Sequence, residues 1–205
     1  MTTAPTLRTL GGAARTAELP AHATALVIID VQNEYFPGGK LLIPDGQRVL
    51  EKNQQLVDFA RSHAMPLFFV QHLGPEDSPI FAKGSGFDDF HPALQPQTGD
   101  RIIQKATPSS FVGTELESQL KSAGIQQLIV SGLMTHMCVS STARDAVPKG
   151  FNVIIPDDAC ATRDVAGWDG KIVGHQELHR AALTAVGDVF AEVMSTEEVT
   201  ALSVR

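Results

Sequence analysis

Cysteine is scarce in this chain, with only Cys138 and Cys160 among 205 residues. Two cysteines cannot build the disulfide framework of a small secreted fold, so we expect free thiols in a reducing, cytoplasmic environment. No apolar run approaches the roughly 20 residues of a membrane-spanning helix, and residues 1–20 contain no apolar segment typical of a secretory signal. The sequence therefore predicts neither a membrane partner nor a secretory leader.

Positive charge is also in short supply, because 16 Lys and Arg stand against 23 Asp and Glu, a formal net charge of -7. With no basic patch to offset that charge, we do not expect nucleic acid as a partner. Hydrophobic residues make up 43% and charged residues 19%, which is typical of a folded globular protein and excludes a disordered chain. The length favours one domain spanning residues 1–205.

Short apolar segments alternate with segments of helical periodicity. Strands are expected at 25–29, 67–70, 101–103, 128–130, 153–155 and 189–193, and helices around 49–60, 116–120, 138–147 and 178–186. Continuous apolar strands indicate burial on both faces, and their alternation with helices indicates parallel pairing. The pattern predicts a three-layer α/β/α domain of the Rossmann-like class, with a doubly wound, mostly parallel, six-stranded sheet.

Two segments fall outside this alternation. Residues 1–22 are expected to form an arm packed on the domain. Residues 72–100 are rich in Gly, Pro, Ser and Asp and too long for an ordinary connection between a strand and a helix. We expect this long loop to cover a pocket or a subunit contact.

Three reactive side chains stand at the ends of predicted strands: Asp30, Lys105 and, after a short turn, Cys138. Taken singly, each has an ordinary explanation as a helix cap, a surface charge or a small buried residue. Ligands bind beyond the carboxyl ends of strands in open α/β sheets, so together the three form a candidate site. A thiol with a carboxylate and an ammonium supplies a nucleophile, a proton acceptor and a balancing charge.

The expected helix beginning at Cys138 predicts a lowered thiol pKa, because backbone N–H groups and the helix dipole favour the thiolate. The turn at 132–137 is unusually apolar for a connection between a strand and a helix. Such a turn could point the backbone N–H groups of Met134 and Cys138 into one hollow as an oxyanion hole. A well-packed buried loop is the competing interpretation of the same segment.

The motifs resemble those of the isochorismatase-like cysteine hydrolases from about residue 25 to residue 193. The resemblance rests on 29–33 (Ile-Asp-Val-Gln-Asn), Lys105 with 110–116 (Ser-Phe-Val-Gly-Thr-Glu-Leu), 132–139 (Gly-Leu-Met-Thr-His-Met-Cys-Val), 156–159 (Pro-Asp-Asp-Ala) and 179–183 (His-Arg-Ala-Ala-Leu). It implies a doubly wound fold, a homo-oligomer (dimer or tetramer), a cis peptide bond at Leu133–Met134 and hydrolysis of small amides or related C–N bonds. It also implies that Cys138 is the nucleophile, Asp30 the proton carrier and Lys105 the residue that orients Asp30.

The chain departs from the nicotinamidases of this family, whose Asp-x-His metal cluster follows the second strand; residues 71–76 here read Gln-His-Leu-Gly-Pro-Glu. We therefore expect no metal and no cofactor. Asp89 and His91 have metal-ligand spacing but lie far downstream, and His175 and His179 are interpreted as surface or packing residues. Cys160 is interpreted as a small buried residue.

Several side chains near these motifs are candidates to line a pocket for a small-molecule amide. They are Tyr35, Phe36, His72, Phe111, Leu133 and His136. His136 is also a second candidate for the base. Two other functions remain open: an enol-ether hydrolase, which needs no thiol, and a redox-responsive thiol protein without hydrolase activity. The sequence does not choose among aryl amides, ureido acids and cyclic amides.

Overall fold

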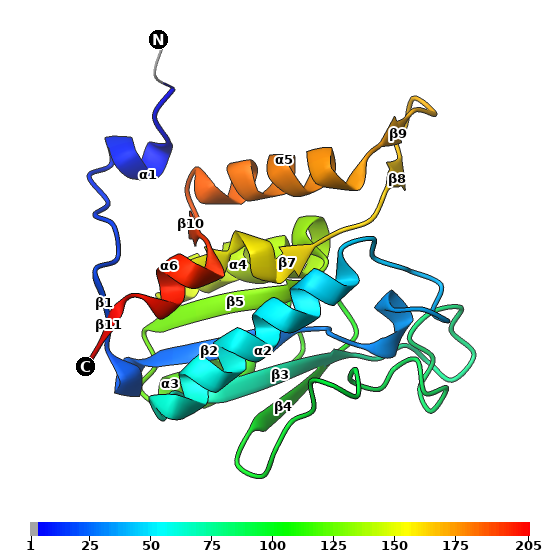
Figure 1. Ribbon diagram of the computed structural model, residues 1–205, viewed down its shortest axis with the longest axis horizontal. Helices are drawn as coiled ribbons and strands as arrows, with labels where there is room; N and C mark the ends of the chain where they lie inside the picture. The colour runs from blue at the N-terminus through cyan, green and yellow to red at the C-terminus, as the bar shows by residue number, and fades with distance from the viewer. Residues whose placement is uncertain (1–3) are drawn as a thin grey trace.

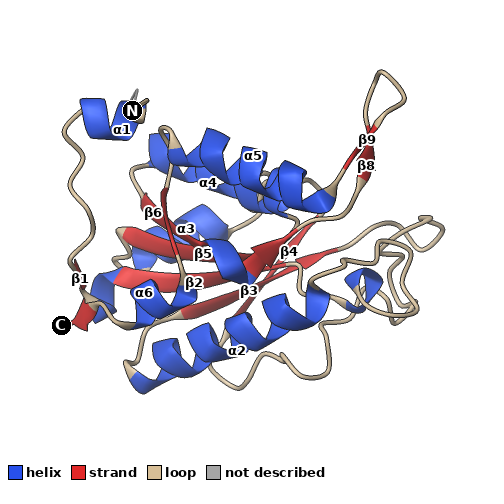
Figure 2. Ribbon diagram, turned by 45° about the horizontal axis from the view of Figure 1, so that its top comes forward, coloured by secondary structure: helices blue, strands red, loops and turns tan. Residues whose placement is uncertain are grey.

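A parallel sheet forms the centre of the structure, a computed structural model that describes residues 4–205 (Figures 1 and 2). Its main path runs in the order β10-β6-β5-β2-β3-β4, with every pair parallel. The strands are β2 (Thr24–Ile29), β3 (Leu67–His72), β4 (Arg101–Lys105), β5 (Gln127–Leu133), β6 (Asn152–Pro156) and β10 (Glu192–Met194). The six predicted strands are present, although the last lies later than 189–193. A two-residue seventh strand, β7 (Cys160–Ala161), pairs with the end of β5 and was not predicted.

Helices cover both faces of the sheet (Figure 2). One face carries α2 (Gly46–Ser62) and α6 (Thr196–Thr200), and the other carries α3 (Leu116–Ser122), α4 (Ser140–Ala146) and α5 (His175–Gly187). Alternate side chains of β2 divide between the two cores: Leu26 and Ile28 pack with α2, whereas Val27 and Ile29 pack with α3 and α4. This arrangement confirms the three-layer, doubly wound α/β/α prediction.

Smaller elements flank the three layers. The arm contains α1 (Leu7–Leu10) and β1 (Glu18–Leu19), which pairs with β11 (Ser203–Val204); its first three residues lie outside the described chain. A hairpin of β8 (Val165–Ala166) and β9 (Ile172–Val173) projects from the body of the molecule (Figure 1). Short turns of helix complete the chain: η1 (Ala21–Ala23), η2 (Asn33–Tyr35), the π-helix η3 (Thr135–Val139), η4 (Val147–Lys149) and η5 (Asp157–Ala159). Among residues 4–205, no helix is long and apolar enough to cross a membrane.

The strand order changes direction between β2 and β5, and this is where a doubly wound sheet opens a crevice for ligands. Gly132, near the end of β5, has φ 107°, a conformation that favours glycine. An added side chain at Gly132 would also collide with the carbonyl oxygen of Ile29 on β2. The two strands therefore approach closely where Asp30 and the segment containing Cys138 emerge.

The loop at 72–100 packs against the segment that follows β2. Gln32 donates its side-chain amide to the carbonyl oxygens of His72 (2.9 Å) and Asp88 (2.6 Å). The Glu34 carboxylate accepts the N–H of Phe81 at 3.0 Å. Because Gln32 and Glu34 are buried, these hydrogen bonds fix the loop beside the carboxyl edge of the sheet.

Candidate active site

Asp30, Lys105 and Cys138 converge where the strand order changes direction. The Lys105 ammonium lies 2.6 Å from the Asp30 carboxylate and 3.3 Å from the Cys138 sulfur. The side chains of Asp30 and Lys105 have no exposed surface, and 6% of Cys138 is exposed. Asp30 has φ 52°, a left-handed conformation that Asp tolerates better than most residues, directly after β2. The structure thus brings the three predicted residues into contact from three different strand ends.

Lys105 also donates to the carbonyl oxygen of Thr107 (3.2 Å) and lies 3.0 Å from His72 Nδ1. Burial and the Lys105 charge lower the pKa of His72 to about 4. The imidazole is therefore neutral at pH 7 and accepts a hydrogen bond from the ammonium. His72, predicted to contact substrate, is placed by the structure against Lys105.

The expected lowering of the Cys138 pKa is wrong. Burial, reinforced by the Asp30 charge, raises the pKa of the Cys138 thiol to about 12, and the Lys105 charge only partly offsets this rise. Burial also raises the pKa of Asp30 above its ordinary value, against the opposing charge of Lys105. The resting thiol is consequently protonated, and a base would have to remove its proton before the sulfur could act as a nucleophile.

The helix around Cys138 starts earlier than predicted. Thr135–Val139 form a π-helical turn that leads into α4, so Cys138 lies inside the helical segment and not at its first residue. The N–H group of Val139 bonds to the carbonyl oxygen of Met134 at 3.2 Å. The peptide bond between Leu133 and Met134 is cis, as the resemblance implies. The oxyanion role of the Met134 and Cys138 N–H groups stays a prediction.

The predicted pocket residues lie at different depths. Leu133 and Phe36 pack in the core on the α2 side, and Phe111 stacks on Phe151 on the opposite side. Tyr35 is buried, and burial together with the Asp30 charge raises the pKa of its phenol. Contact of these four side chains with substrate stays a prediction.

His136, the second candidate for the base, lies 2.6 Å through Nδ1 from the hydroxyl of Thr162. The Asp30 carboxylate is instead the group that contacts both the Lys105 ammonium and the Cys138 thiol. Asp30 therefore stays the predicted base, and His136 stays a candidate contact for substrate.

Among residues 4–205, one group of metal-ligating side chains converges: Asp30, His72 and Cys138, whose donor atoms lie within 4.8 Å of one another. The Lys105 ammonium lies within 3.3 Å of a donor atom of each of the three. A positive charge at that position opposes a metal ion, so the site does not suit one.

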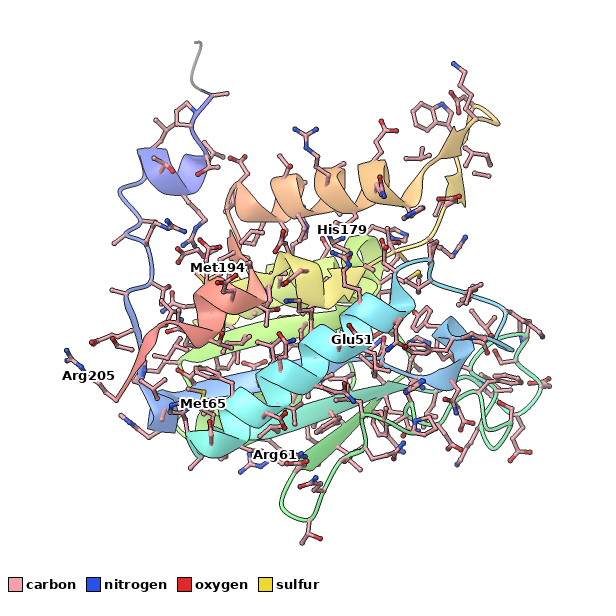
Figure 3. The ribbon with its side chains drawn as sticks, in the orientation of Figure 1. Glu51, Arg61, Met65, His179, Met194 and Arg205 are labelled. Atoms are coloured by element: carbon pink, nitrogen blue, oxygen red, sulfur yellow. The ribbon has the colours of Figure 1, made fainter. Side chains whose placement is uncertain are left out.

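Two histidines of α5, interpreted from the sequence as surface or packing residues, have separate partners. His175 lies 2.7 Å from the Asp164 carboxylate, and His179 lies 2.8 Å from the Thr135 hydroxyl. Figure 3 shows His179 on the side of α5 that faces the sheet. His91 accepts the N–H of Ala93 through Nδ1 and packs on Phe36. Each of these histidines has a local structural explanation.

Two residues of this region had no assigned role in the sequence analysis. Gln32 is hydrogen-bonded to the backbone of His72 and to the long loop. Its position two residues after Asp30 is the sequence feature that could have marked it as part of the site. Arg163 follows β7, and its charge affects the pKa of both Tyr35 and His136. No motif marked Arg163, because its position depends on the unpredicted strand β7.

The protonation state of Cys138 gives a testable expectation. The rate of alkylation by iodoacetamide should keep rising with pH above about 8.5, where a free cysteine is half ionised. The Asp30 charge raises the thiol pKa, so Asp30→Asn, which removes that charge, should alkylate faster at a given pH. Cys138→Ala identifies any labelling at Cys160. An unchanged or slower alkylation rate in Asp30→Asn would contradict this electrostatic account.

The fold and the grouped residues define a doubly wound α/β protein with Asp30, Lys105 and Cys138 in contact where the strand order changes direction. The chain belongs to the isochorismatase family, because the profile of the isochorismatase domain matches residues 24–198.

Individual relatives agree with this assignment. An uncharacterized isochorismatase family protein, YddQ of Bacillus subtilis, is 34% identical over 175 residues, which cover 85% of this chain and 97% of that protein. Nicotinamidase 3 of Arabidopsis thaliana is 29% identical over 188 residues, covering 85% and 86%. The crystal structure of an isochorismatase from Pseudomonas putida has a TM-score of 0.89 at 32% identity, covering 96% and 99%.

Proposed function

We propose that the protein is a cysteine-dependent hydrolase that cleaves a C–N bond of a small amide through a thioester intermediate. The observation that carries this proposal is the contact of one buried ammonium with both the Asp30 carboxylate and the Cys138 sulfur. A nucleophile, a base and an orienting group in mutual contact are the requirements of covalent catalysis. The similarity to a nicotinamidase supports an amide as the substrate.

In the first half of the reaction, Asp30 takes the proton of the Cys138 thiol as the sulfur attacks the amide carbonyl carbon. The N–H groups of Met134 and Cys138 stabilise the negative oxygen of the tetrahedral intermediate. Asp30 then gives the proton to the amide nitrogen, and the C–N bond breaks with release of ammonia or an amine. Lys105 keeps the Asp30 carboxylate in place and balances the charge that moves between oxygen and sulfur.

In the second half, Asp30 takes a proton from water, and the resulting hydroxide attacks the thioester carbonyl. The C–S bond breaks, the proton returns to sulfur, and the carboxylic acid product leaves. The raised pKa of Asp30 makes its carboxylate a stronger base, which favours removal of a proton from the thiol in the first half and from water in the second.

A redox role for Cys138 is less well supported than hydrolysis. Oxidation requires an exposed thiol with thiolate character, whereas Cys138 is buried and its pKa is raised to about 12. An enol-ether hydrolase would not use the contact between Lys105 and the sulfur. We also propose a homo-oligomer and a cytoplasmic location, where the free thiols of Cys138 and Cys160 would stay reduced.

The test is a screen for ammonia release over a panel of aryl amides, ureido acids and cyclic amides, with Cys138→Ala as the matched control. We expect at least one compound class to be hydrolysed by wild type far above the rate of the variant. Mass spectrometry after rapid acid quenching should detect the acyl group on Cys138. If wild type and Cys138→Ala hydrolyse every compound at equal rates, the amidase proposal is wrong.

A further inference from the structure

Arg163 is a charged residue near the candidate site for which the described part of the chain, residues 4–205, provides no acidic partner. It follows β7, whose two residues pair with Gly132 and Leu133 directly before the turn that contains Cys138 (Figure 1). The neighbouring Thr162 hydroxyl is 2.6 Å from His136 in that turn. The backbone of residue 163 is thereby held next to the turn that is expected to form the oxyanion hole.

The guanidinium of Arg163 has spare hydrogen-bonding capacity. Its Nε atom is buried and has no hydrogen-bond partner among the described residues, and Nη1 donates to the backbone carbonyl oxygen of Asp164 at 3.0 Å. The nearest carboxylate in the sequence, that of Asp164, instead accepts the backbone N–H of His175 and lies 2.7 Å from its Nδ1. Among residues 4–205, Arg163 forms no ion pair with a carboxylate. A buried guanidinium nitrogen without a partner is costly unless a ligand satisfies it.

The charge of Arg163 reaches the interior of the site. It lowers the pKa of the His136 imidazole, with burial as the larger cause. It also opposes the rise in the pKa of Tyr35, a rise to which Asp30 contributes. Tyr35 is therefore within electrostatic range of the reacting groups and of Arg163. The Lys105 charge is already paired with Asp30, whereas Arg163 is a second positive charge near the site and, among residues 4–205, is not paired with a carboxylate.

We propose that Arg163 binds a carboxylate of the substrate, so that the site favours small amides that carry an anionic group. Arginine suits this task because its fork of N–H groups can hold a carboxylate with two hydrogen bonds and stays charged at every working pH. This inference rests on the proposed function. It narrows the proposed amide substrates to those that carry a carboxylate, namely amic acids, ureido acids and aromatic amides with a carboxylate on the ring. Arg163 is accordingly a specificity residue, and Asp30, Lys105 and Cys138 perform the chemistry.

The experiment compares matched pairs of amides that differ in charge. Succinamate is paired with 4-oxopentanamide, and 4-carbamoylbenzoate with 4-acetylbenzamide, and kcat/KM is measured by ammonia release. Wild type should prefer the anionic member of an accepted pair by about tenfold or more. Arg163→Met should lower kcat/KM for that member by about 10- to 100-fold and change the neutral member by less than about threefold.

Two further variants separate charge recognition from a structural role. Arg163→Lys should restore part of the anionic preference, because it returns the charge without the fork. Arg180→Gln removes an exposed arginine of α5 that also forms no ion pair within residues 4–205, and it should leave the preference unchanged. Equal losses for both members of a pair in Arg163→Met would overturn the proposal, as would a wild-type enzyme that treats the members alike.

Calorimetry on Cys138→Ala measures binding of the same compounds without turnover. Preferential binding of the anionic members, lost when Arg163→Met is added, would support the proposal even if no compound is hydrolysed. In that case the amidase function would be the part that fails. Binding without preference for charge would overturn the role of Arg163 independently of catalysis.

Discussion

Replacing the sulfur of Cys138 should abolish hydrolysis while leaving the protein folded. We expect Cys138→Ala to lower kcat by about 10³-fold or more on any amide that the wild type accepts, because the covalent step has no other nucleophile. The Asp30–Lys105 ion pair survives in this variant, so the free energy of unfolding should fall by only about 1 kcal/mol, a modest loss of packing. Steady-state kinetics and urea unfolding measure the two effects separately.

Cys160→Ala is the matched control, because Cys160 is also a buried free thiol but lies on β7 among core residues. Burial raises its pKa, and nothing in the proposed reaction uses its sulfur. We expect this variant to keep its turnover. An active Cys138→Ala protein would favour the enol-ether alternative. Turnover that is lost equally in both variants would indicate that packing, and not nucleophilicity, explains the loss.

The three-layer fold and the grouping of Asp30 with Cys138 could be predicted from the sequence for the same physical reason. Apolar strands such as 25–29 must be buried on both faces, and parallel strands direct their carboxyl ends to one edge. Asp30 and Cys138 follow the two strands that flank the change of direction, so their contact follows from topology. The motifs shared with the isochorismatase family added the role of Lys105, which lies on a strand two places away from β2.

The protonation state of Cys138 was predicted wrongly because spacing does not measure burial. A helix start exposed to water would lower the thiol pKa, whereas a thiol that is 6% exposed beside a carboxylate loses more from desolvation than it gains. The place of Arg163 could not be predicted either, since β7 has only two residues and no periodicity to recognise. Both failures concern tertiary environment, on which a single sequence carries little information.

Removing the charge of Lys105 should have the largest effect on stability. Lys105→Met would leave the fully buried Asp30 carboxylate without its cation, a change that costs about 3–5 kcal/mol in buried pairs. The comparable change Lys52→Met removes a cation 3.2 Å from Asp158 in a partly exposed pair, and we expect a loss of about 1 kcal/mol or less. Urea unfolding at pH 7 provides both free energies. Equal losses in the two variants would contradict the importance of burial.

The deficit of Lys105→Met should also depend on pH in a direction that identifies Asp30. Burial already raises the pKa of Asp30, and loss of the Lys105 charge removes a factor that lowers it. The folded variant then binds a proton that the unfolded chain releases above about pH 4, so its stability should be highest at acidic pH and fall as pH rises through the folded pKa. Adding Asp30→Asn removes the titrating group, and the double variant should regain much of the stability at pH 7 and lose this pH dependence. A deficit that is constant from pH 5 to pH 8 and is not repaired by Asp30→Asn would mean that the methionine disturbs packing and that the buried charge is not its cause.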